Sequence, residues 1–177
     1  MVFFGDSITE GWKSLAQDFP QFKVANRGIG GDTTRGLRER IQGDVLAVHP
    51  GAVSMLIGTN DLDQGATPEI VLANMKAIVA ELHKANPQMP IIINKVMPRG
   101  AKAGLYPDKI KALNGLLETA FKDDAKVTFC DTWAIFEDGS GGCKRDEFPD
   151  LLHPNAAGYA KWVAALTQIF EKLGVAK

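Results

Sequence analysis

Ser7, Asp150 and His153 are the residues of this chain best suited to nucleophilic chemistry. Ser7 closes a Gly-Asp-Ser segment near the start of the sequence, and Asp150 and His153 are spaced D-x-x-H near its end. A serine hydroxyl becomes a good nucleophile only when a base removes its proton, and a carboxylate can hold a histidine base in the required tautomer. If the fold brings these segments together, the three side chains could cleave an ester.

Two further segments could stabilise the negative charge that such a reaction develops. One runs from Asn26 to Asp32 and contains Gly28-Ile29-Gly30-Gly31, and the other is Gly58-Thr59-Asn60-Asp61. Backbone N–H groups that no side chain covers, and the amide of an asparagine, are typical donors to the oxygen of a tetrahedral intermediate. Together the four segments contain every group that acyl transfer requires.

Each segment also has a purely structural interpretation. Residues 7–10 match the S-x-x-E capping box, in which Ser7 would cap a helix and the glutamate would reach back to it. Asp32 is suited to capping the helix that follows it, and Asn60 with Asp61 could form a simple turn. Taken one at a time, the cap and the turn are the better interpretations of Ser7 and Asn60.

Two other kinds of site are open at this point. Residues 28–31 precede a predicted helix and could hold a phosphate, although their spacing is neither G-x-G-x-x-G nor that of a P-loop. Asp146, Glu147, Asp150 and His153 could bind a metal, but no second histidine lies near them in the sequence. The sequence therefore favours neither a nucleotide nor a metal, and we expect no cofactor.

Alternating strands and helices must position these residues. Apolar residues recur at helical spacing over residues 71–82, 110–121 and 159–173; Thr67-Pro68 opens the first of these helices and Gly174 ends the last. The pattern predicts a doubly wound α/β sandwich with a five-stranded parallel sheet, forming a single domain over residues 1–177. Buried parallel strands are predicted from short apolar runs at residues 2–4, 22–25, 52–57, 91–96 and 127–130.

This architecture predicts where the four segments lie relative to one another. Ligands of an open parallel sheet bind beyond the carboxyl ends of its strands. Three of the segments follow a predicted strand, and the fourth precedes the last helix. We therefore expect Ser7, residues 26–32, Asn60 and His153 to lie at one edge of the sheet.

Length, composition and charge restrict the classes of protein. The chain has 177 residues, of which 45% are hydrophobic and 23% charged, and its net charge of −1 gives no reason to expect binding to nucleic acid or an anionic membrane. No apolar run approaches the ~18 residues of a membrane span. As given, the sequence predicts a cytoplasmic protein, and secretion if residues upstream of Met1 are missing. Cys130 and Cys143 could pair or stay free.

The four segments, in this order and with these spacings, resemble the conserved blocks of the SGNH hydrolases, also called GDSL esterases and lipases. The GDS block corresponds to residues 5–7, the glycine block to 26–32, the GxND block to 58–61 and the DxxH block to 150–153. NRGIGGDTTRGLRERI, MPRG and LLHPNAAGYAKW are most similar to catalytic subunits of platelet-activating-factor acetylhydrolases and their bacterial relatives. Several carbohydrate acetylesterases share the same framework.

The resemblance implies a flavodoxin-like, three-layer α/β/α SGNH hydrolase fold and a role for each block. Ser7 would be the nucleophile, His153 the general base and Asp150 its partner. The oxyanion would be held by the backbone N–H groups of Ser7 and Gly31 and by the side-chain amide of Asn60. The reaction would be ester hydrolysis through an acyl-enzyme without a cofactor, and related proteins include homodimers.

The substrate is less closely defined. No long apolar insertion could form a fatty-acyl tunnel, so we expect an acetyl ester of a carbohydrate or a similar small compound. Asp6, Arg27, Asp32 and Arg99 could contact that substrate, and residues 97–103 and 133–148 could form the walls of its site. A lysophospholipase or thioesterase is the alternative enzyme. A non-catalytic flavodoxin-like module that binds FMN or phosphate is the alternative of a different class.

Overall fold

The computed structural model describes residues 1–100 and 107–175, and these form an α/β fold around one sheet. The sheet has five parallel strands, as predicted, and their order is β2-β1-β3-β4-β5. The strands are short, and each has four residues: β1 Val2–Gly5, β2 Ala25–Gly28, β3 Val53–Leu56, β4 Ile91–Asn94 and β5 Val127–Cys130.

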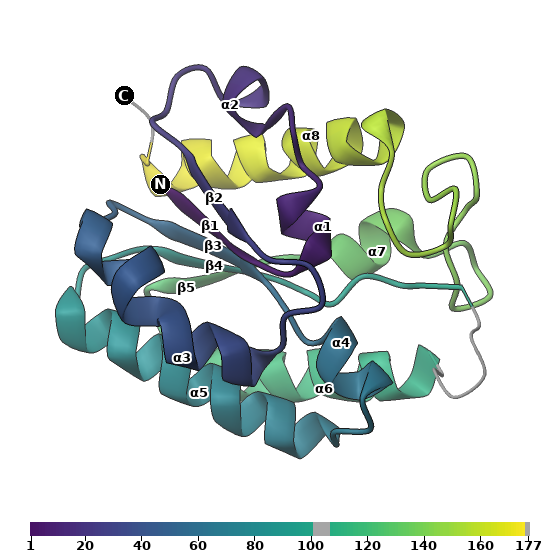
Figure 1. Cartoon of the computed structure of the whole chain (residues 1–177), viewed down its shortest axis with the longest axis horizontal. Coiled ribbons are helices and arrows are strands. Elements are labelled where there is room, and N and C mark those ends of the chain that lie inside the picture. Colours follow the sequence, from purple (N-terminus) through teal and green to yellow (C-terminus); the bar gives the residue numbers. More distant parts are fainter. Residues whose placement is uncertain (101–106, 176–177) are drawn as a thin grey trace.

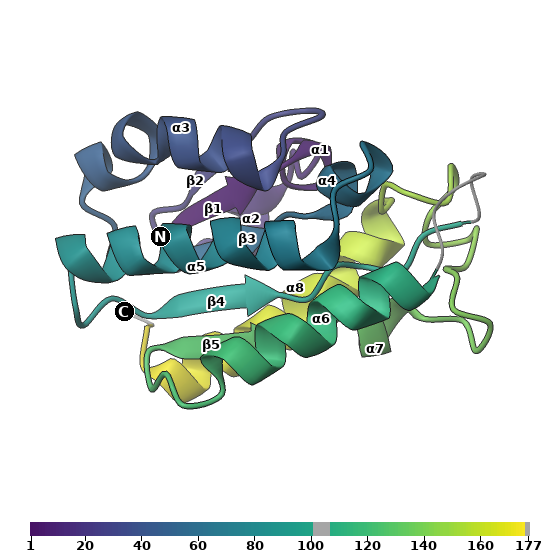
Figure 2. The same ribbon diagram turned by 90° about the horizontal axis from the view of Figure 1, so that it is seen from below.

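Helices cover both faces of the sheet and complete the expected three layers (Figure 1). Figure 2 shows α3, α5 and α6 side by side across one face, with α8 behind the sheet. One face carries α1 (Ser7–Glu10), α2 (Leu15–Asp18), α7 (Thr132–Phe136) and α8 (Ala156–Leu173). The other carries α3 (Thr34–Asp44), the 3-10 helix η1 (Leu46–Val48), α4 (Thr59–Asp63), α5 (Pro68–Ala85) and α6 (Pro107–Phe121).

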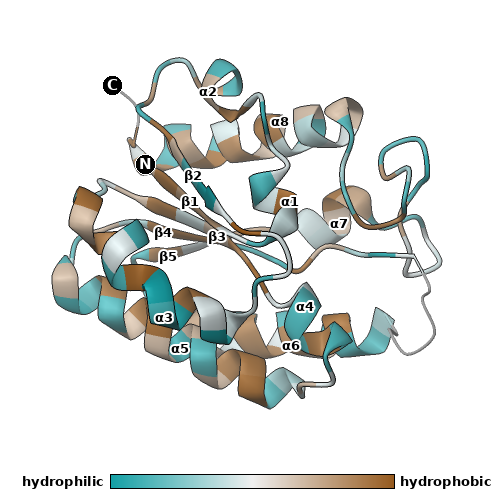
Figure 3. Cartoon of the chain, in the orientation of Figure 1, coloured by the Kyte–Doolittle hydropathy of each residue, from teal (hydrophilic) through white to brown (hydrophobic). Residues whose placement is uncertain are grey.

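Two apolar layers lie between the sheet and these helices. Successive strand residues point to opposite faces, so Phe3 packs with the aromatic side chains of the α8 face while Phe4 packs with the α3 and α5 face. Figure 3 shows that the inner strands are largely apolar, whereas the helices alternate between apolar and polar residues, as expected for helices with one buried face. No helix of the described residues is both long enough and apolar enough to cross a membrane.

The second strand differs from its prediction. Residues 22–25 were expected to form it, but β2 is Ala25–Gly28, whose residues pair with β1 from Val2 to Gly5. Phe22 is apolar for another reason: its ring packs against Phe19 and Phe170 outside the sheet. Because β2 is an edge strand, its polar residues can face solvent or neighbouring loops, and no apolar run marks it in the sequence.

The helix boundaries agree more closely with the sequence. Thr67 caps α5 by accepting a hydrogen bond from the backbone N–H of Ile70, and Pro68 is its first residue. Gly174 ends α8 in the left-handed conformation, with φ of 61°.

Cys130 and Cys143 are buried free thiols, and burial raises their pKa to about 12 and about 11, respectively.

Candidate active site

Ser7, His153 and Asp150 form one hydrogen-bonded chain beyond the carboxyl end of β1. Nε2 of His153 lies 2.8 Å from Oγ of Ser7, and Nδ1 lies 2.6 Å from Oδ2 of Asp150. Oδ1 of Asp150 also accepts the backbone N–H groups of Leu152 and His153, at 3.0 and 2.7 Å. Partial burial opposes ionisation, but these hydrogen bonds outweigh it and lower the pKa of Asp150 to about 2. Asp150 is therefore an anion at neutral pH and fixes the orientation of the imidazole.

Asp6, rather than Ser7, caps the first helix. Its Oδ1 accepts the backbone N–H of Ile8 at 2.9 Å, and its backbone is extended. Residues 7–10 therefore do not form the capping box that their pattern allows, and Ser7 is the first helical residue. Because Asp6 provides the cap, the Ser7 hydroxyl is free to bond to His153, and the Ser7 backbone N–H has no intrahelical acceptor.

Asp6 is also an unusual carboxyl group. It is fully buried, and its Oδ2 has no hydrogen-bond partner among the described residues. Burial is the main cause that raises the pKa of Asp6 to about 7. Asp6 lines a small cavity together with Ile8 and Leu152. The sequence singled out Asp6 as a substrate contact, and the structure places it behind the serine as the helix cap.

The loop between β2 and α3 faces Ser7 with glycines. A Cβ added at Gly30 would lie 4.0 Å from Cβ of Ser7, and one added at Gly31 would meet nothing within 4 Å. Gly31 has a φ of 76°, a conformation that favours glycine. The amide of Asn60 donates a hydrogen bond to the carbonyl of Asp32 at 2.8 Å, which fixes Asn60 against this loop and leaves its second N–H available.

The first turn of α3 is anchored to α4 by a buried carboxylate. Asp61 accepts the backbone N–H of Thr34 through both oxygens, at 3.1 and 3.0 Å, and also accepts the Thr34 hydroxyl. Thr33 caps α3, so the prediction that Asp32 is the cap is wrong by one residue; Asp32 instead accepts the backbone N–H of Thr33. Since these N–H groups already have acceptors, the start of α3 is poorly suited to bind a phosphate.

The two arginines predicted to contact substrate, Arg27 and Arg99, donate hydrogen bonds to other groups of the protein. Arg27 donates to the carbonyl of Asp44 at the end of α3. Arg99 is buried, with only 3% of its side chain exposed, and donates to the hydroxyl of Thr59 at 3.2 Å. Residues 101–103, part of the predicted wall, lie outside the described residues. Among residues 1–100 and 107–175, no group of three His, Cys, Asp or Glu side chains could hold a metal ion.

Three side chains support the site in ways that the sequence did not predict. The hydroxyl of Tyr159, on α8, donates to the carbonyl of Ile8 at 2.8 Å, and the amide of Asn26 donates to the carbonyl of Thr9 at 2.7 Å. Both fix α1, which carries the serine. Arg40 contacts the ends of two strands and the glycine loop. In the sequence, Tyr159 belongs to an apolar helical stripe and Arg40 to a charged helix, so neither carries a local signal of this role.

The sequence also matches a known family across most of its length. Residues 3–161 fit the model of the GDSL-like lipase/acylhydrolase family. The chain belongs to this family. As a GDSL acylhydrolase it is an ester-hydrolysing enzyme, and the likeness to SGNH hydrolases predicted from the four blocks is confirmed.

Relatives of this GDSL acylhydrolase cover almost the whole chain. The human platelet-activating factor acetylhydrolase IB subunit alpha2 is 31% identical over 180 residues, which span 98% of this chain and 76% of that subunit. A GDSL-like lipase from Bacteroides thetaiotaomicron is 28% identical with a TM-score of 0.86, covering 97% of this chain and 87% of that one. An acetylxylan esterase from Geobacillus stearothermophilus shares the fold at 22% identity, with a TM-score of 0.77 and coverage of 98% and 93%. These similarities confirm the predicted fold class.

Proposed function

We propose that this GDSL acylhydrolase hydrolyses short-chain esters, acetyl esters above all, through an acyl-enzyme formed on Ser7. The observation that carries the proposal is the unbroken hydrogen-bonded chain from Asp150 through His153 to Ser7. The alcohol would be a carbohydrate or a similar small compound. The similarity to an acetylhydrolase subunit supports the acetyl preference.

The geometry supports a defined role for each group. Nε2 of His153 takes the proton of Ser7 as its Oγ attacks the ester carbonyl, and the anionic Asp150 stabilises the imidazolium that forms. The oxyanion accepts hydrogen bonds from the backbone N–H groups of Ser7 and Gly31 and from the amide of Asn60. His153 then protonates the leaving alcohol and later activates the water that releases the acid.

A small apolar cavity lined by sequence neighbours of Ser7 and His153 supports the preference for a short acyl group. Its volume is about 10 Å³, which is space for a group about the size of one water molecule. Ile8 and Leu152 line it, directly after Ser7 and directly before His153 in the sequence. An acetyl methyl group would fit this space with little adjustment, whereas a longer chain would require the lining side chains to move.

Two measurements test the proposal. Wild-type protein should hydrolyse 4-nitrophenyl acetate and react with a fluorophosphonate probe at Ser7, and Ser7→Ala should lose both properties while it keeps its thermal unfolding transition. Rates with acetyl, butyryl and octanoyl esters should fall as the chain lengthens. Full turnover by Ser7→Ala would refute the nucleophile, and a rate that rises with chain length would indicate a lysophospholipase or thioesterase instead.

A further inference from the structure

We infer that Arg40 is a positioning residue for the reaction, because it holds the segment that carries the nucleophile and the segment that carries the oxyanion donor at a fixed separation. The inference rests on the proposed function, since it concerns the site around Ser7. Arg40 lies in the middle of α3 and does not contact Ser7, His153 or Asp150 through any hydrogen bond of the described residues.

The guanidinium of Arg40 bonds to both segments at once. Its Nη2 donates to the carbonyl of Gly5 at 3.0 Å, and its Nε donates to the carboxylate of Asp32 at 2.7 Å. Gly5 is the last residue of β1 and comes two residues before Ser7, whereas Asp32 directly follows Gly31. One rigid planar group therefore links the two segments that must face each other in the transition state.

The remaining contacts fix the guanidinium itself. Nη1 donates to the carbonyl of Arg27, in β2, at 2.9 Å and to the carboxylate of Asp44 at 2.6 Å. The guanidinium carbon also lies 4.5 Å from the centre of the Phe4 ring in β1. Only 17% of the Arg40 side chain is exposed. Because all three nitrogens of the guanidinium donate hydrogen bonds, its position and orientation are fixed.

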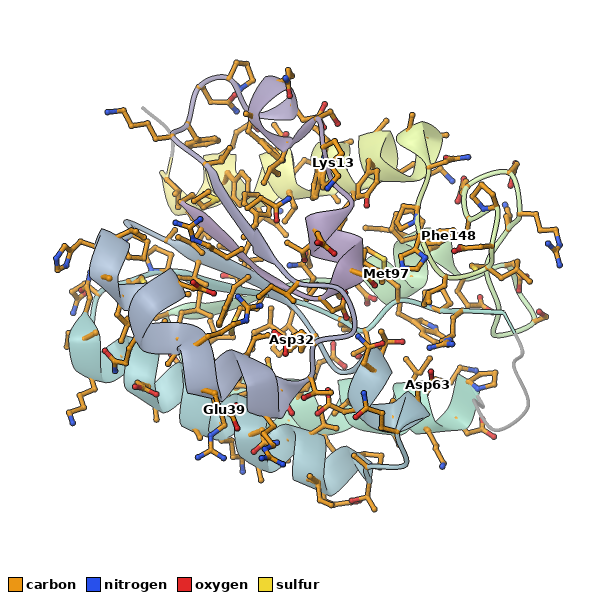
Figure 4. The ribbon with its side chains drawn as sticks, viewed as in Figure 1. Lys13, Asp32, Glu39, Asp63, Met97 and Phe148 are labelled. Carbon is orange, nitrogen blue, oxygen red and sulfur yellow. The ribbon has the colours of Figure 1, made fainter. Side chains whose placement is uncertain are left out.

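The ion pair with Arg40 gives Asp32 a structural role at the site. The sequence suggested it as a substrate contact, but its carboxylate is only 11% exposed and is paired with Arg40. Its carbonyl accepts the amide of Asn60 at 2.8 Å. Arg40 thus acts, through Asp32, on the Asn60 donor as well as on the Gly31 loop. Figure 4 shows Asp32 at the start of α3 toward the sheet, whereas Glu39 lies on the outer side of that helix.

Lysine cannot reproduce this geometry. An ammonium group keeps the positive charge that neutralises Asp32, but it is a single point without the planar fork that reaches Gly5 and Asp32 together. Oxyanion donors act mainly in the transition state, so a small displacement should lower kcat and leave KM almost unchanged. A displacement of about 1 Å can lower a rate by about 100-fold.

The experiment compares Arg40→Lys and Asp32→Asn with wild type and with Arg35→Gln. Arg35 lies on the same helix, is 83% exposed and, within the described part of the chain, forms its ion pair with Glu39, which is also exposed, so its loss should change little. The number of reactive sites is counted from the end point of fluorophosphonate labelling. The values of kcat and KM for 4-nitrophenyl acetate, and the initial labelling rate, are then expressed per reactive site.

We expect full labelling at the end point for every variant, and a kcat per site that is lower by about 10- to 100-fold in Arg40→Lys, with unchanged KM and a slower labelling rate. Asp32→Asn should show a smaller decrease of the same kind, and it keeps the test available if Arg40→Lys folds poorly. An unchanged kcat per site in either variant would overturn the inference and leave the proposed function intact. Unlabelled, inactive wild type would instead refute the proposed function, and the inference with it.

Discussion

The buried carboxyl of Asp6 should make the stability of this protein depend on pH in a direction opposite to that of most carboxyl groups. Burial raises the pKa of Asp6 from its ordinary value of 3.8 to about 7 in the folded protein. Between these two pH values the folded protein holds a proton that the unfolded chain releases. The free energy of unfolding contributed by Asp6 is therefore fully present below about pH 4 and is lost as pH rises through about 7.

The size of the effect follows from the difference in pKa. Each unit of difference between the folded and unfolded states corresponds to about 1.4 kcal/mol, so Asp6 should remove about 4 kcal/mol of stability by pH 8. For a protein of this length, that loss corresponds to a Tm on the order of 10 °C lower. Asp150 does not interfere, because its pKa is lowered to about 2 and its contribution changes below pH 4.

Asp6→Asn tests this prediction without removing the helix cap. The asparagine oxygen can still accept the backbone N–H of Ile8, as Oδ1 of Asp6 does, and the amide does not titrate. Thermal unfolding of both proteins, followed by circular dichroism from pH 4 to pH 8, should give a Tm of Asp6→Asn that rises relative to wild type across this range. The same substitution at Asp123, whose side chain is 90% exposed, should follow wild type at every pH.

The difference between the two Tm values matters more than either value alone. A buried amide in place of Oδ2 can change stability by a constant amount, but that amount cannot vary with pH. If the Tm difference between Asp6→Asn and wild type is the same at pH 4 and pH 8, the pKa of Asp6 is not raised by burial, and the reasoning fails.

Three further predictions concern the surroundings of Ser7. Asn60→Ala should lower kcat for 4-nitrophenyl acetate by roughly 10²–10³-fold, the usual effect of losing one oxyanion donor; an unchanged kcat would show that Asn60 only forms the start of α4. Tyr159→Phe removes the hydrogen bond to the carbonyl of Ile8 and should lower the free energy of unfolding in urea by about 1 kcal/mol, so equal midpoints would contradict it. Met97 lines the same small cavity as Ile8 of α1 and belongs to the same apolar cluster (Figure 4); Met97→Ala should raise the butyryl-to-acetyl rate ratio, and a constant ratio would place the acyl group elsewhere.

The fold class follows from local patterns in the sequence. Continuous apolar runs in β1, β3, β4 and β5 predict strands buried on both faces, and the apolar stripes of α5, α6 and α8 predict the covering helices. These signals are local, because each element must bury its own apolar side chains. The edge strand β2 carries polar residues at Asn26 and Arg27, and for that reason its position was missed.

The sequence also indicated Ser7, Asn60, Asp150 and His153 as candidates, because their side chains suit acyl transfer and because Ser7 and Asn60 follow predicted strands while Asp150 and His153 precede the last helix. It did not show that Asp6, rather than Ser7, caps the first helix. Asp6 and Ser7 are both good N-cap residues, and the choice between them depends on where His153 lies. That residue follows Ser7 by 146 positions, so only the folded chain determines which hydroxyl it meets.

The contacts that support the site arise only in the folded chain. The hydrogen bonds between Arg40 and Gly5, between Asp61 and Thr34 and between Tyr159 and Ile8 join residues that are 35, 27 and 151 positions apart, respectively. An arginine in a helix, an aspartate after an asparagine and a tyrosine in an apolar stripe have no distinctive local pattern. Their roles arise because α3, α4 and α8 pack against one sheet. This packing brings the polar groups of Arg40, Asp61 and Tyr159 to backbone atoms of segments that are distant in the sequence.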